Sequence, residues 1–323
     1  MNRIQAQKIV ERIQNIPLYL HAYAFHLNMR MEKILPEGLL DIASEQKLKG
    51  VKVHVLDGES QSLSCADDAR LQKFGEKARS LGLDVHIETS ASDAETIDAA
   101  VAIALKSDAS SVRFYPRYEG HLAEVLAQVK QDIQYIKAHY QHSGLTFTLE
   151  QHEDLKSHEL VRLIEEADFP QLSFLVDFAN MINANEEPLP ALAAMASKIT
   201  QVHIKDALII REANGLGHQA CISGQGDLPF KELLFQLICL GEHSPQVMAY
   251  GLEEEVDYYA PPFRFQGEDN NPWIPWRQMS ETELPKENLD TRLEKEFDDA
   301  INQIHYVRNI LNELAQEAIA VLN

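Results

Sequence analysis

Eight short apolar or β-branched segments recur along the chain, separated by longer segments in which apolar residues return every three or four positions. The clearest helices are expected at residues 94–106, 120–140, 157–167 and 229–240. Strands that alternate with helices form parallel sheets, and a count of eight favours closure into a barrel. The predicted fold is therefore an α/β protein, a (β/α)8 TIM barrel. Its expected strands are residues 17–23, 50–56, 83–89, 110–116, 145–151, 172–178, 199–205 and 247–253.

A Rossmann-type sheet is the main alternative among α/β folds. It would need a glycine-rich turn after the first strand, where a dinucleotide pyrophosphate binds. Residues 17–28, which hold the first expected strand and the turn after it, contain no glycine. The sequence therefore favours the barrel.

The alternation of strands and helices ends after the eighth expected strand. Residues 258–290 are rich in proline and aromatic residues, which is typical of an ordered, packed segment. We therefore expect a catalytic barrel over residues 1–257 and a C-terminal extension over residues 258–323, which packs on the barrel or on a partner subunit of a homo-oligomer. The extension would consist of a Pro/aromatic-rich excursion and a long terminal helix from Thr291 to Asn323, whose apolar stripe is Leu293, Phe297, Ile301, Ile304, Ile310 and Leu314.

The composition limits which partners the protein can bind and in which cellular compartment it is expected. The formal net charge is −21 at pH 7, and such a surface repels phosphodiester backbones, so no nucleic-acid partner is expected. No apolar run approaches the roughly 18 residues of a membrane span, and the amino-terminal residues lack a secretory signal, so we expect a cytoplasmic protein with no membrane partner. The three cysteines have no CxxC spacing, which argues against a disulfide framework or a cysteine zinc site.

Each of the last four expected strands carries an acid or an imidazole at or near its carboxyl end, after an apolar approach: Glu150, Asp177, His203 and Glu253. Catalytic groups of such barrels come from the carboxyl ends of the strands. Taken singly, each residue also fits a loop, a helix cap or a packed core position. Together they would surround one axis, where three carboxylates repel one another unless a divalent cation joins them. One imidazole and three carboxylates favour Mn²⁺ or Mg²⁺, with Co²⁺ and Zn²⁺ also compatible.

Four segments in this order, LEQHEDLKS, VDFAN, VHIKD and GQGDLPF, resemble the signature of the sugar phosphate isomerase/epimerase superfamily, the xylose isomerase-like TIM barrels. The resemblance covers residues 17–256. It implies metal ligands at the same four strand ends. Glu254 and Glu255 are alternatives for the last ligand, and Glu253 is preferred because its Leu-Glu pair repeats that of Glu150.

Two departures from the family pattern leave the substrate open. Asn180 stands where some members have a second histidine, three residues after the aspartate. Others have an arginine shortly after the histidine of the seventh strand, where this chain offers Lys205, Asp206 and the later Arg211.

The resemblance implies an isomerase or epimerase of a sugar, keto-sugar or related polyhydroxy carbonyl compound. Glu150 and Glu253 would act as the acid/base pair on opposite faces of an enediolate that the cation stabilises. Expulsion of a β-hydroxyl from the same enediolate would make the protein a dehydratase, as in members that act on dehydroshikimate or inosose.

Several other residues are candidates for contacts with the substrate, and each also has a structural explanation. His152 could instead orient Glu150, and Lys205 could instead pair with Asp206 at the surface. The glycines of GQGDLPF fit either a close approach to a ligand or a plain tight turn. The substrate-binding candidates are His152, Lys205, Arg113 and Asn180, whereas packing roles are expected for His21, His26, His54 and His86.

Two further classes of protein share this architecture. An endonuclease IV-like phosphodiesterase uses several metals and many histidine ligands, and it is disfavoured by the single histidine in the inferred set and by the acidic surface. A non-catalytic sugar-binding barrel is disfavoured because all four ligand types are retained. The metal content of the purified protein would separate the three classes.

Overall fold

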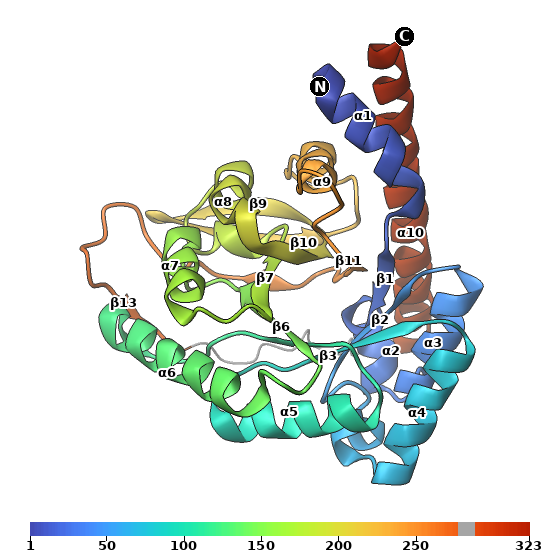
Figure 1. Ribbon diagram of the computed structural model, residues 1–323, viewed down its shortest axis with the longest axis horizontal. Coiled ribbons are helices and arrows are strands. Elements are labelled where there is room, and N and C mark those ends of the chain that lie inside the picture. The colour runs from blue at the N-terminus through green and yellow to red at the C-terminus, as the bar shows by residue number, and fades with distance from the viewer. Residues whose placement is uncertain (277–287) are drawn as a thin grey trace.

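The computed structural model describes residues 1–276 and 288–323. Eight parallel strands form a closed barrel, and β1 closes it by pairing with both β2 and β11 (Figure 1). Each barrel strand lies within one of the eight expected segments, so the predicted (β/α)8 fold is confirmed. The strands are β1 (Leu18–His21), β2 (Gly50–His54), β3 (Asp84–Glu88), β4 (Ser111–Phe114), β6 (Thr146–Gln151), β7 (Leu172–Asp177), β8 (Ile199–Ile204) and β11 (Ala249–Leu252).

Helices surround the barrel, and the four clearest predicted ones have bounds within two residues of those expected. In α5 the Asp93 side chain accepts a hydrogen bond from Thr96 N and so caps the first turn. The apolar face of this helix, with Ile97 and Val101, is buried against the sheet. The helices are α1 (Arg3–Arg12), α2 (His26–Arg30), α3 (Pro36–Glu45), α4 (Asp68–Ser80), α5 (Ala94–Lys106), α6 (Leu122–Tyr140), α7 (Ser157–Ala167), α8 (Pro188–Met195), α9 (Phe230–Cys239) and α10 (Leu289–Leu322).

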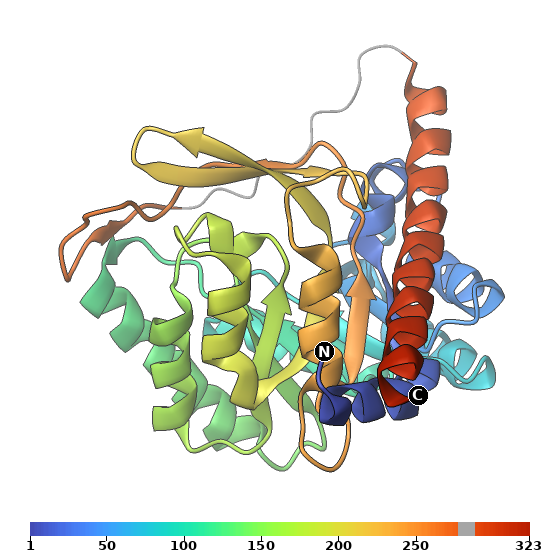
Figure 2. The same cartoon turned by 90° about the horizontal axis from the view of Figure 1, so that it is seen from above.

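The terminal helix α10 lies along the side of the barrel, next to α1, and the two chain ends lie near each other (Figures 1 and 2). Gln303 on α10 donates a hydrogen bond from Nε2 to the carbonyl oxygen of Ile204 at 2.9 Å, which ties the helix to the end of β8. Most of the expected apolar stripe is buried, but Phe297 is 38% exposed and contacts Phe25 with its ring. Among the described residues, no helix has the length and apolar character needed to cross a membrane.

A three-stranded antiparallel sheet follows β8 and was not expected from the sequence. Figure 2 shows it lying across the end of the barrel toward which the strand arrows point. The missed signal is a hairpin whose strands are joined by Ala213 and Asn214 alone, a loop length typical of tight β-turns. The sheet consists of β9 (Asp206–Glu212), β10 (Gly215–Cys221) and β12 (Tyr259–Ala260), and a second small pair joins β5 (Gly120–His121) to β13 (Trp273–Ile274).

The described part of the Pro/aromatic-rich excursion is anchored over the barrel mouth. Asn183 donates from Nδ2 to the carbonyl oxygens of Ala260 and Pro261, both at 2.8 Å. Arg264 is buried and donates to both carboxylate oxygens of Glu159, at 2.8 and 2.9 Å. The expectation of an ordered segment is thus met for residues 258–276, although the two tryptophan side chains are about half exposed. Residues 277–287 of the expected excursion lie outside the described residues, and the division at residue 257 remains a prediction.

Candidate metal centre

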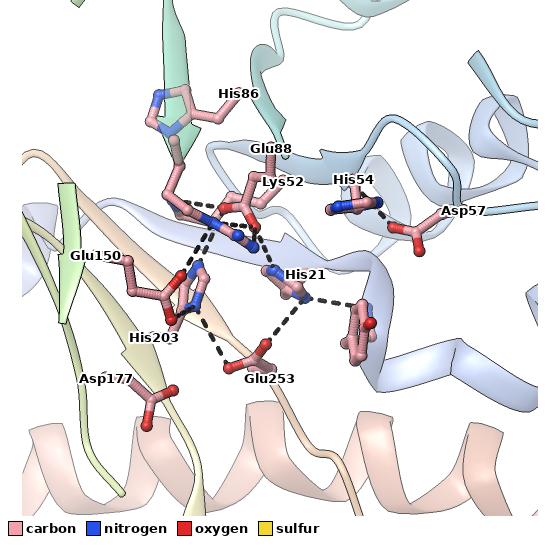
Figure 3. A network of polar contacts seen from close by, with 12 residues as sticks. His21, Lys52, His54, Asp57, His86, Glu88, Glu150, Asp177, His203 and Glu253 are labelled. Atoms are coloured by element: carbon pink, nitrogen blue, oxygen red, sulfur yellow. Dashed lines mark hydrogen bonds and ion pairs between the residues drawn. The ribbon is translucent and has the colours of Figure 1, made fainter. Parts of the chain in front are cut away.

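The four expected ligand side chains meet at the carboxyl end of the barrel (Figure 3). Asp177 ends β7, Glu150 and His203 each lie one residue before the end of β6 and β8, and Glu253 follows β11. Polar atoms of Glu150, Asp177 and His203 all lie within 4.8 Å of one another. His203 Nδ1 is 3.6 Å from Glu150 Oε1 and 3.4 Å from Glu253 Oε2. The arrangement therefore gathers one imidazole and three carboxylates around a common space.

One buried polar atom of each of these four residues has no hydrogen-bond partner among the described residues. Buried polar atoms are nearly always paired, because leaving water without a new partner is costly. A cation bound by all four atoms would remove that cost. Carboxylate oxygen and imidazole nitrogen are ligand types that divalent cations accept. The residues present therefore fit a divalent metal ion. The four atoms are Glu150 Oε2, Asp177 Oδ2, His203 Nδ1 and Glu253 Oε2.

A second group, His21, Glu88 and His203, also lies close enough to share an ion. Here, however, Glu88 is already surrounded by cationic side chains. Lys52 Nζ donates to Glu88 Oε1 at 3.3 Å, and Arg113 Nε donates to Glu88 Oε2 at 3.0 Å. The first group is the better candidate because each of its three residues keeps a buried atom without a hydrogen bond among the described residues. Two of these atoms, Glu150 Oε2 and Asp177 Oδ2, also form ion pairs, at 3.1 and 3.2 Å.

Mutual electrostatics set the protonation of the centre in the absence of a cation. Burial lowers the pKa of His203, but Glu253 and Glu88 outweigh burial and raise it to about 9. Burial raises the pKa of Glu253 to about 7, against the opposing effects of His203 and Lys205. Burial also raises the pKa of Glu150, but Arg113 and His203 together outweigh burial and lower that pKa overall.

Lys205 lies inside the barrel mouth, not at the surface. It is 3% exposed, and its Nζ is 3.2 Å from Asp177 Oδ2, 3.8 Å from Glu253 Oε2 and 3.6 Å from Glu255 Oε2. The alternative of a surface ion pair with Asp206 is wrong. Successive side chains of an extended segment point to opposite sides, so Lys205 shares the inward side with His203 and Asp206 does not.

The GQGDLPF turn wraps around the carboxylate of Asp206. The backbone N–H groups of Gly224 and Gly226 donate to Asp206 Oδ2 at 2.8 and 3.0 Å. A Cβ atom on Gly226 would lie 2.0 Å from Asp206 Oδ1, so this position needs glycine. The close approach that these glycines permit is thus to a side chain of the same chain.

The same alternation separates the three consecutive glutamates after β11. Glu253 and Glu255 line the small cavity at the barrel mouth. Glu254 points away and accepts hydrogen bonds from Ser223 N and Oγ at 2.8 and 2.6 Å. The geometry therefore favours Glu253 over Glu254 as the residue that joins the other three.

The remaining candidates also line this cavity, which has a volume of about 60 Å³. Asn180 donates from Nδ2 to Glu150 Oε1 at 3.3 Å. Arg113 lies 3.1 Å from Glu150 Oε2 in addition to its bonds to Glu88. His152 stacks on Tyr115 with ring centroids 3.9 Å apart. A larger groove of about 630 Å³ lies on the outer surface along α6 and α7, away from these residues.

The first half of the barrel contributes more to the site than the sequence indicated. His21 was expected only to pack, but its Nε2 is 2.8 Å from Glu88 Oε2 and its Nδ1 is 3.6 Å from Glu253 Oε1. His54 lines the cavity and its Nε2 is 2.7 Å from Ser90 Oγ. Glu88 could have been found, because it is the next-to-last residue of the third expected strand, just as Glu150 is of the fifth.

Comparisons with known proteins agree with the barrel fold. Residues 40–248 match the family described as xylose isomerase-like TIM barrel. The uncharacterized protein YihM of Escherichia coli (strain K12) is 67% identical over 319 residues, which is 98% of each chain. The chain therefore belongs to the xylose isomerase-like TIM-barrel family.

Two more distant proteins are also similar to this chain. The 3-oxo-isoapionate decarboxylase of Pectobacterium atrosepticum is 21% identical over 278 residues, which covers 84% of this chain and 91% of that protein. A crystal structure of D-psicose 3-epimerase in the presence of D-fructose superposes with a TM-score of 0.61 at 12% identity, covering 92% of this chain and 99% of the other. The latter likeness is one of fold.

Proposed function

We propose that this protein is a divalent-metal-dependent isomerase or epimerase of a sugar, keto-sugar or related polyhydroxy carbonyl compound. The observation that carries the proposal is the set of four buried atoms, on Glu150, Asp177, His203 and Glu253, that lack hydrogen-bond partners at the catalytic end of the barrel. Membership of the xylose isomerase-like family supports the proposal, as does the shared fold with D-psicose 3-epimerase.

In this proposal the two glutamates of the centre move the proton. When bound, a divalent cation polarises the substrate carbonyl and stabilises the negative charge of an enediolate. Glu150 is oriented by Arg113 and Asn180, so that its carboxylate can take a proton from the carbon beside the carbonyl. Glu253 can return a proton from another side, because β11 lies two strands beyond β7 and three beyond β6 in the barrel order. Return to the same carbon gives an epimer, and return to the neighbouring carbon gives an isomer.

The proposed cofactor is one Mn²⁺ or Mg²⁺ ion, with Co²⁺ or Zn²⁺ also compatible with the ligand types. Around it, His152, Lys205, Arg113 and Asn180 would face the substrate from the walls of the cavity. Tyr258 lines the same cavity, and its hydroxyl donates a hydrogen bond to Glu153 Oε1 at 2.8 Å. In this position the Tyr258 ring would help to keep water from a reactive enediolate.

A second candidate reaction is the decarboxylation of a 3-oxo acid. The observation that favours it is the sequence similarity, over 84% of this chain, to the 3-oxo-isoapionate decarboxylase of Pectobacterium atrosepticum. Loss of CO₂ from a 2-hydroxy-3-oxo acid leaves its electron pair on the substrate as the same type of enediolate, which then takes a proton. The Lys205 ammonium, held in the cavity beside Glu253, could receive the substrate carboxylate.

Both reactions are tested with the purified Mn²⁺-loaded protein in D₂O. The substrates are keto-sugars, inososes, dehydroshikimate and 3-oxo sugar acids. Mass spectrometry measures deuterium uptake into the substrate or product. A coupled assay measures CO₂, and a diode-array spectrum detects dehydration. We expect deuterium at the carbon beside the carbonyl, with no CO₂, for at least one keto-sugar or inosose. CO₂ release instead identifies the decarboxylase, and metal-independent turnover would contradict the proposal.

A further inference from the structure

Glu88 is the most heavily contacted carboxylate in the barrel interior, and it is completely buried. Its Oε1 receives Lys52 Nζ at 3.3 Å and lies 3.0 Å from His203 Nε2. Its Oε2 receives Arg113 Nε at 3.0 Å and lies 2.8 Å from His21 Nε2. Figure 3 shows both imidazole rings directed at this carboxylate. A carboxylate accepts hydrogen bonds and does not donate them, so these contacts constrain what each ring nitrogen can carry.

The protonation of His21 follows from its other nitrogen. The backbone N–H of Tyr23 lies 3.0 Å from His21 Nδ1, and a backbone amide can only donate. His21 Nδ1 is therefore an acceptor without a proton. The ring proton must be on Nε2, where it is donated to Glu88 Oε2.

The same carboxylate fixes His203 from the other side. His203 Nε2 faces Glu88 Oε1 at 3.0 Å, so this nitrogen carries a proton. An imidazole can bind a cation only through a nitrogen without a proton. The nitrogen left for that purpose is Nδ1, which faces Glu150 and Glu253 at 3.6 and 3.4 Å.

Two basic side chains explain how a buried carboxylate can serve this purpose. An uncompensated buried charge is costly, whereas Lys52 and Arg113 surround Glu88 with positive charge. Lys52 is itself fully buried, and Gly251 makes room for it, since a Cβ atom there would lie 2.7 Å from Lys52 Cδ. Arg113 also reaches Glu150 at 3.1 Å, so it links the inner carboxylate to the centre.

We infer that Glu88 is a positioning residue of the metal centre, which binds the Nε2–H groups of His21 and His203 and thereby directs His203 Nδ1 to the cation. This inference rests on the proposed metal centre, and it assigns Glu88 no contact with substrate or metal. A carboxylate behind a ligating histidine typically changes metal affinity by about 10- to 100-fold.

The test is Glu88→Gln in the full-length protein, with Mn²⁺ binding measured by isothermal titration calorimetry. The glutamine amide offers one acceptor oxygen and one NH₂ group to a shell made only of donors. Each oxygen of Glu88 receives at least two donors, so at least two of them lose their acceptor. We expect Mn²⁺ to bind about 10- to 100-fold more weakly. The matched control is Asp132→Asn, since Asp132 is also buried and accepts from Ser92, Tyr118 and Gln128 but lies on α6, outside the centre. The control should bind Mn²⁺ as the wild type does.

The possible failures are distinguishable. Wild-type affinity in Glu88→Gln, together with lost binding in His203→Ala, would overturn the role of Glu88 and leave the metal centre intact. No binding of Mn²⁺, Mg²⁺, Co²⁺ or Zn²⁺ by the wild type would overturn the proposed function and this inference with it.

A measurement on the unmodified protein keeps the inference testable if Glu88→Gln does not fold. Nitrogen-15 NMR of the histidine rings in Zn²⁺-loaded protein reports which nitrogen holds the proton. We expect a proton on Nε2 and the metal on Nδ1 of His203. A proton on Nδ1, or metal on Nε2, would overturn the inference.

Discussion

His203 Nδ1 lies 3.4 Å from Glu253 Oε2, and neither atom has a hydrogen-bond partner among the described residues. The two residues come from neighbouring strands, because His203 pairs in register with Gly251, two residues before Glu253. Two buried polar atoms that face each other without bonding indicate a missing third participant. Glu150 and Asp177, on the next strands of the same barrel, each have a buried oxygen without a hydrogen bond among the described residues, which makes a shared cation the simplest explanation.

The first prediction concerns the proposed proton-transferring residue. Glu150→Gln should lower kcat by about 10²- to 10⁴-fold, because an amide cannot accept the substrate proton. Circular dichroism should show an unchanged fold. Glu254→Gln is the matched control, since this neighbouring carboxylate bonds to Ser223 instead of facing the cavity. Comparable activity in Glu150→Gln and the control would remove Glu150 from the mechanism.

The second prediction concerns metal removal. A cation that binds only the folded state stabilises it, by about 2.7 kcal/mol when its free concentration is 100 times its Kd. Chelation should therefore lower the melting temperature and abolish turnover, and added Mn²⁺ should restore both. Differential scanning calorimetry checks the stability, and His203→Ala should show no response to Mn²⁺. A response that persists in this variant would place the cation elsewhere.

The third prediction concerns the segment over the barrel mouth. Asn183→Ala removes the amide that bonds Ala260 O, Pro261 O and His218 Nδ1. Each buried group left unsatisfied costs about 1–3 kcal/mol, so urea unfolding should show a loss of at least that size. Asn214→Ala, which removes a single longer bond at an exposed position, is the control. Equal stabilities of the two variants would contradict the anchoring role of Asn183.

The fourth prediction concerns acid stability. Burial raises the pKa of Glu268, but hydrogen bonds from Arg264 and Lys156 outweigh it and lower the pKa to about 2. A carboxyl whose pKa is depressed in the folded state stabilises the fold above its ordinary pKa of 4.5 and loses that contribution as the pH falls toward 2. Glu268→Gln should therefore be less stable than the wild type at neutral pH. The difference in the free energy of unfolding should shrink between pH 4.5 and 2, and a difference independent of pH would disprove the ion pair's contribution.

Periodicity predicted the barrel because strand and helix periods are properties of short segments. The run VDF with Asp177, and the run LEQ with Glu150, each show an acid at the end of a buried strand, and the barrel topology makes such ends converge. This reasoning placed the four side chains together without any knowledge of their distances.

The contacts of Glu88 could not be predicted in the same way. Its partners come from four other strands, and which cation faces which carboxylate depends on barrel register. The inward position of Lys205 could have been derived from alternation along the seventh expected strand, because Lys205 is two residues after His203. The hairpin after β8 was missed because its turn, at Ala213 and Asn214, lies within a segment without strong apolar alternation.

The measurement that tests the account most directly is a crystal structure of the Mn²⁺-soaked protein, with the metal located by anomalous scattering. The account predicts one strong anomalous peak within bonding distance of Glu150, Asp177, His203 Nδ1 and Glu253. A peak bound by His21 and Glu88 instead, or no peak at the barrel mouth, would contradict it.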